Sequence, residues 1–165
     1  MSTALHAAYA LPCDVEAAYA VLSGEGWPAA KDAALHDGSR LESREETDDG
    51  GVVLRSTRGM PSGIPGFLEK ILPADGRAGQ TDTWAAAQAD GSRTGTWRAD
   101  VPGAPVDVHG TMRLVPTATG CDYVIEGTAK VKIPLIGGKA EKFVADATAR
   151  TTAGEADVLR SLVTG

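Results

Sequence analysis

The chain contains no asparagine, only two cysteines and few aromatic residues, with Trp 3, Tyr 3 and Phe 2 among 165 positions. The absence of asparagine excludes N-glycosylation and any reaction step that depends on an asparagine side chain. Cys13 and Cys121 are too few for a disulfide framework. They predict either two reduced thiols or one reversible bridge, and reduced thiols are the usual state in the cytoplasm.

Basic charge and long apolar runs are also scarce. The chain has 16 Lys and Arg against 22 Asp and Glu, for a net charge of −6. This acidic balance argues against nucleic-acid binding, which needs clustered basic residues. No run reaches the roughly 18 apolar residues of a membrane-spanning helix, so no integral membrane association is expected. The first residues, MSTALHAAYALPC, lack the basic start of a signal peptide, and we therefore expect a cytoplasmic protein.

Large apolar side chains are few as well. The chain has 27 Ala but only 12 Leu, 13 Val, 5 Ile and 2 Phe, so the last four types supply 32 of 165 residues. Such a share borders on that of disordered chains, but disorder also needs a high net charge, which is absent here. We therefore predict one folded domain over residues 1–165, whose core contains few large side chains and is partly hollow.

Residues 4–36 predict a first strand and two short helices. Residues 4–11 alternate weakly, as a strand does. A helical spacing follows in the apolar residues Val15, Ala18, Tyr19 and Leu22, with Cys13 at the expected N-cap position. A second short helix is expected from Trp27 to about residue 36, with Pro28 in its first turn.

From residue 39 the hydrophobic period changes to two, which predicts strands. They are expected near residues 39–47, 52–60, 80–89, 93–101, 105–115 and 121–135. Short turns such as Asp48-Asp49-Gly50-Gly51 join neighbouring strands, so the sheet should be an antiparallel meander. A segment rich in Gly and Pro, residues 61–73, interrupts this meander and carries several apolar side chains.

Residues 137–163 contain no proline and predict one long helix. Its inward stripe is expected to consist of Ala140, Phe143, Ala147, Thr151, Gly154, Val158 and Leu162. The middle of this stripe is small, although a helix that filled a solid core would place Leu or Ile there. The small middle therefore predicts open space between helix and sheet.

The expected order of elements resembles that of the START-like (SRPBCC) superfamily, whose fold is called the helix-grip. This order is a strand, two short helices, six strands and a long helix. Two segments are similar to an uncharacterised bacterial branch of that superfamily, related to lipid-transfer and polyketide-cyclase-like domains. They are residues 131–141, VKIPLIGGKAE, and the pair of runs DGSRTGTW at 90–97 and PVDVHGT at 105–111. The resemblance implies an α+β fold in which a curved seven-stranded antiparallel sheet surrounds the C-terminal helix, with an apolar cavity between them.

Motifs for metal, cofactor or nucleophile chemistry are missing. No spacing of histidines and cysteines matches a metal site, and no glycine-rich fingerprint predicts a bound cofactor. Among the histidines, His109 falls on the outward face of its strand and only His6 could approach the covered side. Asp100 is the nearest candidate for an inward carboxylate. We therefore predict no catalytic residues.

The sequence favours a protein that binds or carries a hydrophobic small molecule, lipid-like or polyketide-like, with its oligomeric state left open. The residues expected to line the cavity are Met60, Phe67, Ile71, Trp97, Met112, Tyr123, Phe143, Ala147 and Thr151. Tyr123 is expected to be the polar group of this cavity, since a buried phenol needs a hydrogen-bond partner. The alternatives are an enzyme of polyketide-cyclase type and a protein-interaction module that uses the apolar loop 61–73.

Overall fold

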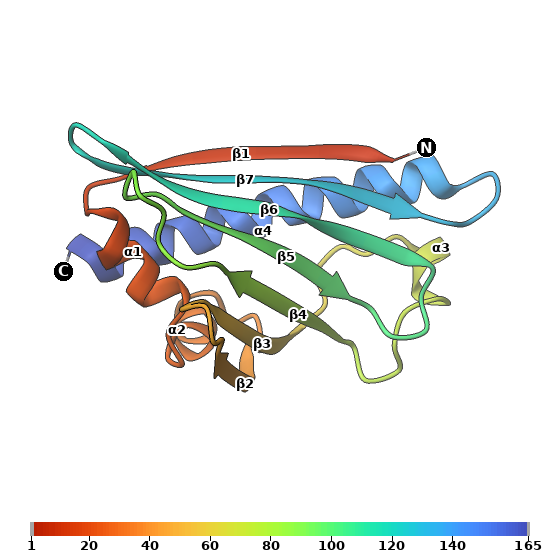
Figure 1. The fold of residues 1–165 in the computed structure, drawn as a ribbon. Helices are drawn as coiled ribbons and strands as arrows, with labels where there is room; N and C mark the ends of the chain where they lie inside the picture. The colour runs from red at the N-terminus through yellow and green to blue at the C-terminus, as the bar shows by residue number, and fades with distance from the viewer. Residues whose placement is uncertain (1, 165) are drawn as a thin grey trace.

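A computed structural model describes residues 2–164, which form a seven-stranded antiparallel sheet around a long C-terminal helix (Figure 1). The elements in chain order are β1 (Thr3–Leu11), α1 (Val15–Leu22), α2 (Trp27–Leu35), β2 (Arg40–Glu46), β3 (Val52–Gly59), α3 (Gly66–Glu69), β4 (Arg77–Trp84), β5 (Arg93–Asp100), β6 (Val106–Thr117), β7 (Gly120–Val131) and α4 (Gly137–Thr164). The strand order is β1-β7-β6-β5-β4-β3-β2. The expected α+β helix-grip fold is therefore confirmed.

Three local details differ from the expectations. Asp14, and not Cys13, is the N-cap of α1, and its carboxylate accepts a hydrogen bond from the Ala17 N–H at 2.8 Å. A short carboxylate one position later is the better cap because it reaches the free backbone donors of the first turn. Residues 61–73 include the one-turn helix α3. β7 ends at Val131, because Pro134 and the left-handed Leu135, with φ 69°, cannot continue the ladder.

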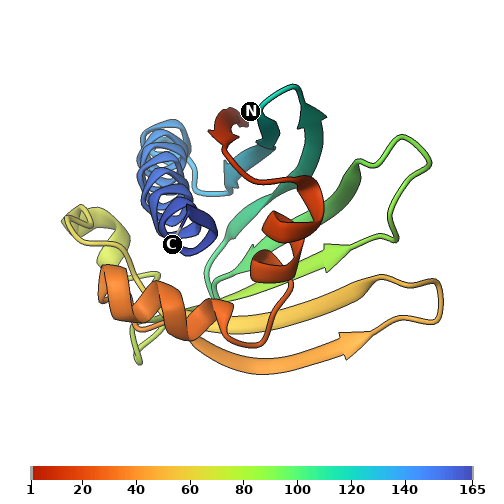
Figure 2. The same cartoon turned by 90° about the vertical axis from the view of Figure 1, so that its left-hand side faces the viewer.

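The sheet curves around α4, and α1 and α2 close one end of the hollow (Figure 2). α4 packs chiefly against β1, β7 and the two short helices. It therefore covers one side of the concave face and leaves the inner face of β3, β4 and β5 at a distance. This off-centre position creates the space in which the cavity lies.

The final helix buries a slightly different stripe from the one expected. Ala140 and Ala147 are buried as predicted, but Leu159 is fully buried while Leu162 is 48% exposed. Gly154 does not open space: a Cβ added there would lie 3.4 Å from the Leu35 side chain of α2. The second half of α4 is therefore packed against α1 and α2, and the hollow part lies along its first half.

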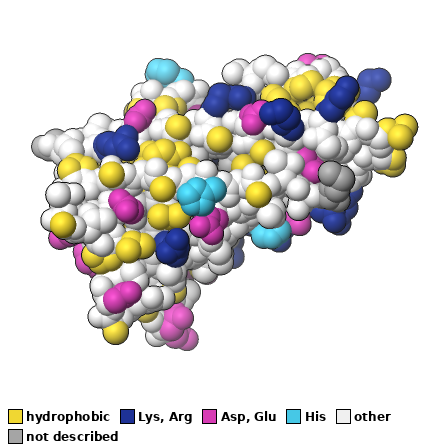
Figure 3. Space-filling view, turned by 90° about the horizontal axis from the view of Figure 1, so that it is seen from above, with side chains coloured by type: hydrophobic (Ala, Val, Ile, Leu, Met, Phe, Trp, Pro, Cys, Tyr) yellow, Lys and Arg dark blue, Asp and Glu magenta, His cyan; other side chains and the backbone are white. Residues whose placement is uncertain are grey.

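The outer surface is polar and carries His6 and His109, for which no catalytic role was expected. His109 is exposed and lies 3.0 Å from the Asp107 carboxylate. The possibility that His6 faces the covered side was wrong, because its side chain is 65% exposed and contacts Glu126. Figure 3 shows charged side chains of both signs interspersed with apolar ones over this face. Within residues 2–164, no helix combines the length and the apolar character that crossing a bilayer requires.

Candidate functional site

A cavity of about 580 Å³ lies between α4 and the inner face of the sheet, and we call it the outer chamber. From α4 it is lined by Phe143, Val144, Ala147, Thr148 and Thr151, and from the sheet by Arg58, Ala78, Ala99, Val106, Val108 and Val131. The lining is mainly aliphatic, as in sites that bind apolar small molecules. The small side chain of Ala147 leaves this volume open.

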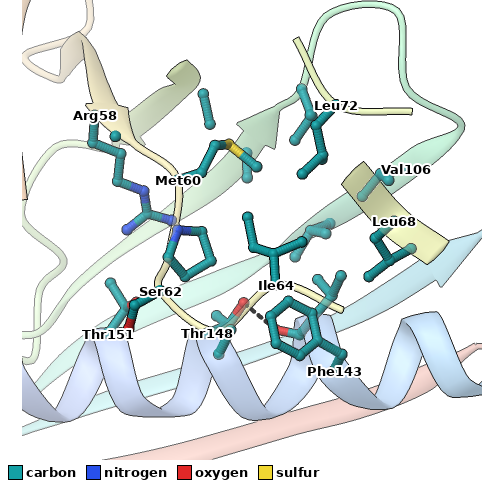
Figure 4. A pocket seen from close by; sticks show the side chains of 18 of the residues that line it. Arg58, Met60, Ser62, Ile64, Leu68, Leu72, Val106, Phe143, Thr148 and Thr151 are labelled. Carbon is teal, nitrogen blue, oxygen red and sulfur yellow. Dashed lines mark hydrogen bonds between the residues drawn. The ribbon is translucent and has the colours of Figure 1, made fainter. Parts of the chain in front are cut away.

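The connection between β3 and β4 covers the outer chamber. Met60, Ile64 and Leu68 line the chamber from this segment, and Ile64 lies next to Phe143 of α4 (Figure 4). Phe67 and Leu68 are neighbours in α3, but only one of the two side chains lines the chamber. Leu68 is buried in the chamber wall, whereas Phe67 is 40% exposed. The cover is thus made of a few apolar side chains on a connection rich in glycine and proline.

A second, smaller space of about 40 Å³ lies deeper in the fold, and we call it the inner chamber. The two chambers share the lining residues Arg58, Ala99, Thr148 and Thr151, so they are neighbours. The inner chamber is further lined by the aromatic residues Trp27, Trp84, Trp97 and Tyr123 and by the polar residues Gln80, Asp82, Thr152 and Glu155. The hollow therefore has an apolar outer part and a polar inner end.

Four ionisable residues from four elements meet at this inner end, and we call Lys31, Arg58, Asp82 and Glu155 the buried ionic cluster; Lys31 and Asp82 are buried, whereas Arg58 and Glu155 are partly exposed. Lys31 Nζ lies 3.8 Å from one Glu155 oxygen, and Arg58 Nη1 lies 3.4 Å from the other. The Lys31 side chain is only 3% exposed and lies over the Trp27 ring. Buried charges of this kind are costly unless they are paired, which Glu155 achieves for both cations.

Asp82 is the inward carboxylate that the sequence analysis missed, because it favoured Asp100, which is exposed. Asp82 lies on β4 and accepts a hydrogen bond from the Gln80 amide at 3.0 Å. Burial raises the pKa of Asp82 above its ordinary value, and nearby Lys31 only partly opposes this. The alternation of side chains along β4 could have identified Asp82 as inward-facing, since it shares its face of the strand with the buried Trp84.

The raised pKa of Asp82 predicts a pH-dependent penalty on folding. The folded state holds a proton that the unfolded chain loses near the ordinary pKa of 3.8, so stability falls as pH rises from there to the raised pKa. Asp82→Asn removes this ionisation and is expected to raise the melting temperature at pH 7. The gain over the parent protein should disappear below about pH 4, where the carboxyl is protonated in both states. Thermal melts of both proteins across pH measure this difference, and a gain independent of pH would contradict it.

Tyr123 lies at the inner chamber on β7, where the sequence analysis expected a polar group. Its side chain is buried, and within residues 2–164 no protein group forms a hydrogen bond with its hydroxyl. Burial, together with the nearby carboxyls of Glu155 and Asp82, raises the pKa of Tyr123 well above its ordinary value. The phenol is therefore a neutral hydrogen-bond donor that faces two acidic side chains.

The structure divides the nine residues expected to line the cavity between the two chambers. Met60, Ile71, Phe143 and Ala147 lie at the outer chamber, and Trp97, Met112 and Tyr123 lie at the inner one. Thr151 lies at both. Phe67 lines neither chamber. The residues that the sequence analysis did not single out are those of the buried ionic cluster, although helical spacing from Thr151 places Glu155 on the same face of α4.

The two cysteines are free thiols, and they differ in accessibility. Burial, with a smaller effect from the neighbouring Cys13 thiol, raises the pKa of Cys121 to about 12. Because the thiolate is the reactive form, we expect iodoacetamide at pH 8 to leave Cys121 unmodified in the folded protein. Intact mass should show at most one added group before unfolding and two after it. A product two mass units light that accepts no label would instead indicate the reversible bridge.

Sequence comparison finds relatives whose function is also unknown. A family model described as "Protein of unknown function (DUF2505)" matches residues 7–163. Uncharacterized proteins of Mycobacterium tuberculosis and Mycobacterium bovis are 28% identical over 100 residues, which is 59% of this chain. The match spans 57% of the length of each mycobacterial relative.

Solved structures with the same fold cover almost the whole chain. The Zhui aromatase/cyclase from Streptomyces sp. R1128 has a TM-score of 0.68 at 11% identity, covering 99% of this chain and 94% of its own. Norcoclaurine synthase from Thalictrum flavum has a TM-score of 0.59 at 18% identity, covering 99% and 87%. Ara h 8.0201 has a TM-score of 0.62 at 12% identity, covering 99% of both chains. At these identities the comparison establishes the fold alone, which is the helix-grip.

Proposed function

The chain belongs to the DUF2505 family of proteins of unknown function, and from its fold and cavity we propose that it binds and carries a hydrophobic small molecule. The observation that carries this proposal is the outer chamber of about 580 Å³ with its aliphatic lining. Its volume lies within the range of about 300–1,000 Å³ typical of small-molecule sites. A core that served only stability would be filled, because interiors normally pack without such voids.

The covering segment between β3 and β4 is the gate in this proposal. Gly63 has a φ of 74°, and a Cβ added at Gly63 or Gly66 would meet no atom within 4 Å. The segment is therefore loosely packed at these two points, which can act as hinges when the apolar side chains of the cover move away from the chamber. The cytoplasm is the compartment that we propose, since both cysteines are free thiols.

Native mass spectrometry of the purified protein tests this function directly. A carrier should retain a co-purifying apolar molecule, or take up an added apolar fluorescent probe in a one-to-one complex. If the protein stays empty and takes up no probe, the carrier function is wrong. The exposed Phe67 within the loop 61–73 would then favour the interaction module.

The expected effect of Ala147→Leu links the cavity to binding. Overpacking a solid core costs about 1–3 kcal/mol, but the added Leu side chain enters the outer chamber and gains contacts there. We therefore expect an unchanged or raised melting temperature together with weaker probe uptake. Ala149→Leu is the matched control, because Ala149 is exposed on the same helix and should change neither quantity. A destabilised Ala147→Leu variant with undiminished uptake would mean that the cavity lies elsewhere.

An enzyme of the cyclase type is the second candidate, and the buried ionic cluster is the observation that favours it. Asp82 and Glu155 provide carboxyls at the end of an apolar chamber, and one protein of the same fold is an aromatase/cyclase. An acid or base in such a site can transfer protons in a bound molecule. Mass spectrometry of the ligand before and after incubation separates the two functions, since a carrier returns its ligand unchanged.

A further inference from the structure

Tyr123 lines the inner chamber, and its hydroxyl is open to that space and has no partner among the described residues. The side chain is 8% exposed, and no hydrogen bond to its hydroxyl exists among residues 2–164. The Thr151 hydroxyl, which borders both chambers, likewise forms no hydrogen bond within the described chain. A phenol on a side chain as buried as that of Tyr123 normally has a hydrogen-bond partner, so its partner is a molecule in the inner chamber, and the partly exposed Thr151 borders the same space.

The size of the inner chamber restricts what that occupant is. Its volume of about 40 Å³ holds a hydroxyl group or one to two water molecules, but it has no room for a ring. A ligand in the outer chamber can therefore place only a small terminal group in the inner one. Figure 4 shows the route: the Arg58 guanidinium reaches from β3 toward Thr151 of α4, at the border between the two chambers.

The charges around the inner chamber restrict the chemistry of that terminal group. Above the raised pKa of Asp82 all four members of the buried ionic cluster are ionised, and their two positive and two negative charges cancel. An ionised ligand group would therefore add a net charge to a desolvated site, which is costly. A neutral hydroxyl adds none, and it can donate to Asp82 or Glu155 while it accepts from Tyr123.

We infer that the inner chamber is a recognition site for the hydroxyl group of an otherwise apolar ligand, whose body fills the outer chamber. This inference rests on the proposed binding function and narrows its ligand class to apolar alcohols or phenols. Tyr123 and Thr151 are the specificity-determining residues, because their hydroxyls are the free hydrogen-bonding groups that meet the ligand. The carboxylates of Asp82 and Glu155 are the acceptors available for the hydrogen bond that the ligand hydroxyl donates.

Three probes that share one apolar body test this inference: 2-naphthol, 2-methylnaphthalene and 2-naphthoate, each titrated calorimetrically. A purely apolar cavity prefers the methyl compound, since burying a hydroxyl without a partner is unfavourable. We expect the opposite order, with 2-naphthol bound most tightly and 2-naphthoate most weakly. Tyr123→Phe should weaken 2-naphthol binding by about 3- to 10-fold, the loss typical of one hydrogen bond, and leave 2-methylnaphthalene unchanged.

Tyr9→Phe is the matched control. The Tyr9 ring is tilted against the Tyr123 ring with centroids 6.5 Å apart, but Tyr9 lines neither chamber, and its hydroxyl bonds to Thr152, which also donates to the Ala149 carbonyl. This variant should bind all three probes like the parent. Thr151→Val, which keeps the shape of the side chain, provides a second variant that should lower 2-naphthol affinity selectively.

The outcomes separate this inference from the function on which it rests. Tightest binding of 2-methylnaphthalene, with no effect of Tyr123→Phe or Thr151→Val on 2-naphthol, overturns hydroxyl recognition and leaves the carrier function standing. Tightest binding of 2-naphthoate overturns it in favour of anion recognition by Arg58. Failure of all three probes to bind the parent protein overturns both.

Discussion

Gly110→Ala is expected to destabilise the protein by at least about 3 kcal/mol, at the upper end of the cost of overpacking. A Cβ at Gly110 would lie 1.8 Å from the Glu126 carbonyl oxygen and 2.5 Å from the Gly127 Cα. Both neighbours are backbone atoms of β7, the strand paired with β6, so neither can move without distorting the ladder. Urea denaturation of the variant, monitored by tryptophan fluorescence, measures this loss.

Trp97 explains why the glycine pair exists. Gly110 and Gly127 are opposite each other in the ladder of β6 and β7, and Trp97 is paired with Gly110 from β5. A Cβ at Gly127 would lie 2.6 Å from the Trp97 ring. The indole N–H donates to the carbonyls of Thr111 and Glu126, at 3.2 Å each. The large ring thus occupies the space that two missing side chains leave, and helps to form the wall of the inner chamber.

Gly138→Ala is the control for this prediction. Gly138 lies in the first turn of α4 with no atom within 4 Å of an added Cβ, and its φ is not positive. Alanine in a helix is more favourable than glycine by roughly 0.5–1 kcal/mol, so this variant should be as stable as the parent or slightly more stable. Equal stability of the two alanine variants would mean that β6 and β7 are further apart than described.

Glu155→Gln is expected to cost about 3–5 kcal/mol, as does the removal of one partner from a buried ion pair. The substitution keeps the size of the side chain but removes the negative charge that pairs with both Lys31 and Arg58. Lys31 is then left with no carboxylate oxygen within 4 Å, although its side chain is only 3% exposed. Thermal and urea denaturation should both show the loss.

Lys31→Met provides the comparison that isolates this effect. The methionine side chain retains the apolar contact with Trp27, and Glu155 keeps its ion pair with Arg58. We therefore expect this single variant to lose much less stability than Glu155→Gln. In the double variant, Glu155→Gln should cost less than it does in the parent, because no buried ammonium is left unpaired. Strictly additive losses would contradict a direct coupling between Lys31 and Glu155.

Local patterns in the sequence were sufficient to predict the order of strands and helices, and the resemblance to START-like proteins implied how they are arranged. The period of two located the strands, with ends up to five residues away as in β4, because most strands have one covered face and one face in contact with solvent. The absence of proline after residue 137 and the small residues in the middle of α4 indicated a long helix over an open space. Tyr123 could be placed on the inner face by counting alternate residues along β7, since side-chain direction in a strand depends only on position.

The polar end of the cavity could not be predicted from local sequence patterns. Lys31, Arg58, Asp82 and Glu155 come from α2, β3, β4 and α4, and each is an isolated charged residue in its own segment. Their meeting depends on the curvature of the sheet and on the tilt of α4 toward β1 and β7, which result from packing over the whole domain. Likewise, Leu68 and not Phe67 faces the outer chamber because of the orientation of a single helical turn. The sequence by itself determined the elements and their faces. Only the tertiary structure decided which faces meet, because long-range packing brings together residues that no local pattern connects.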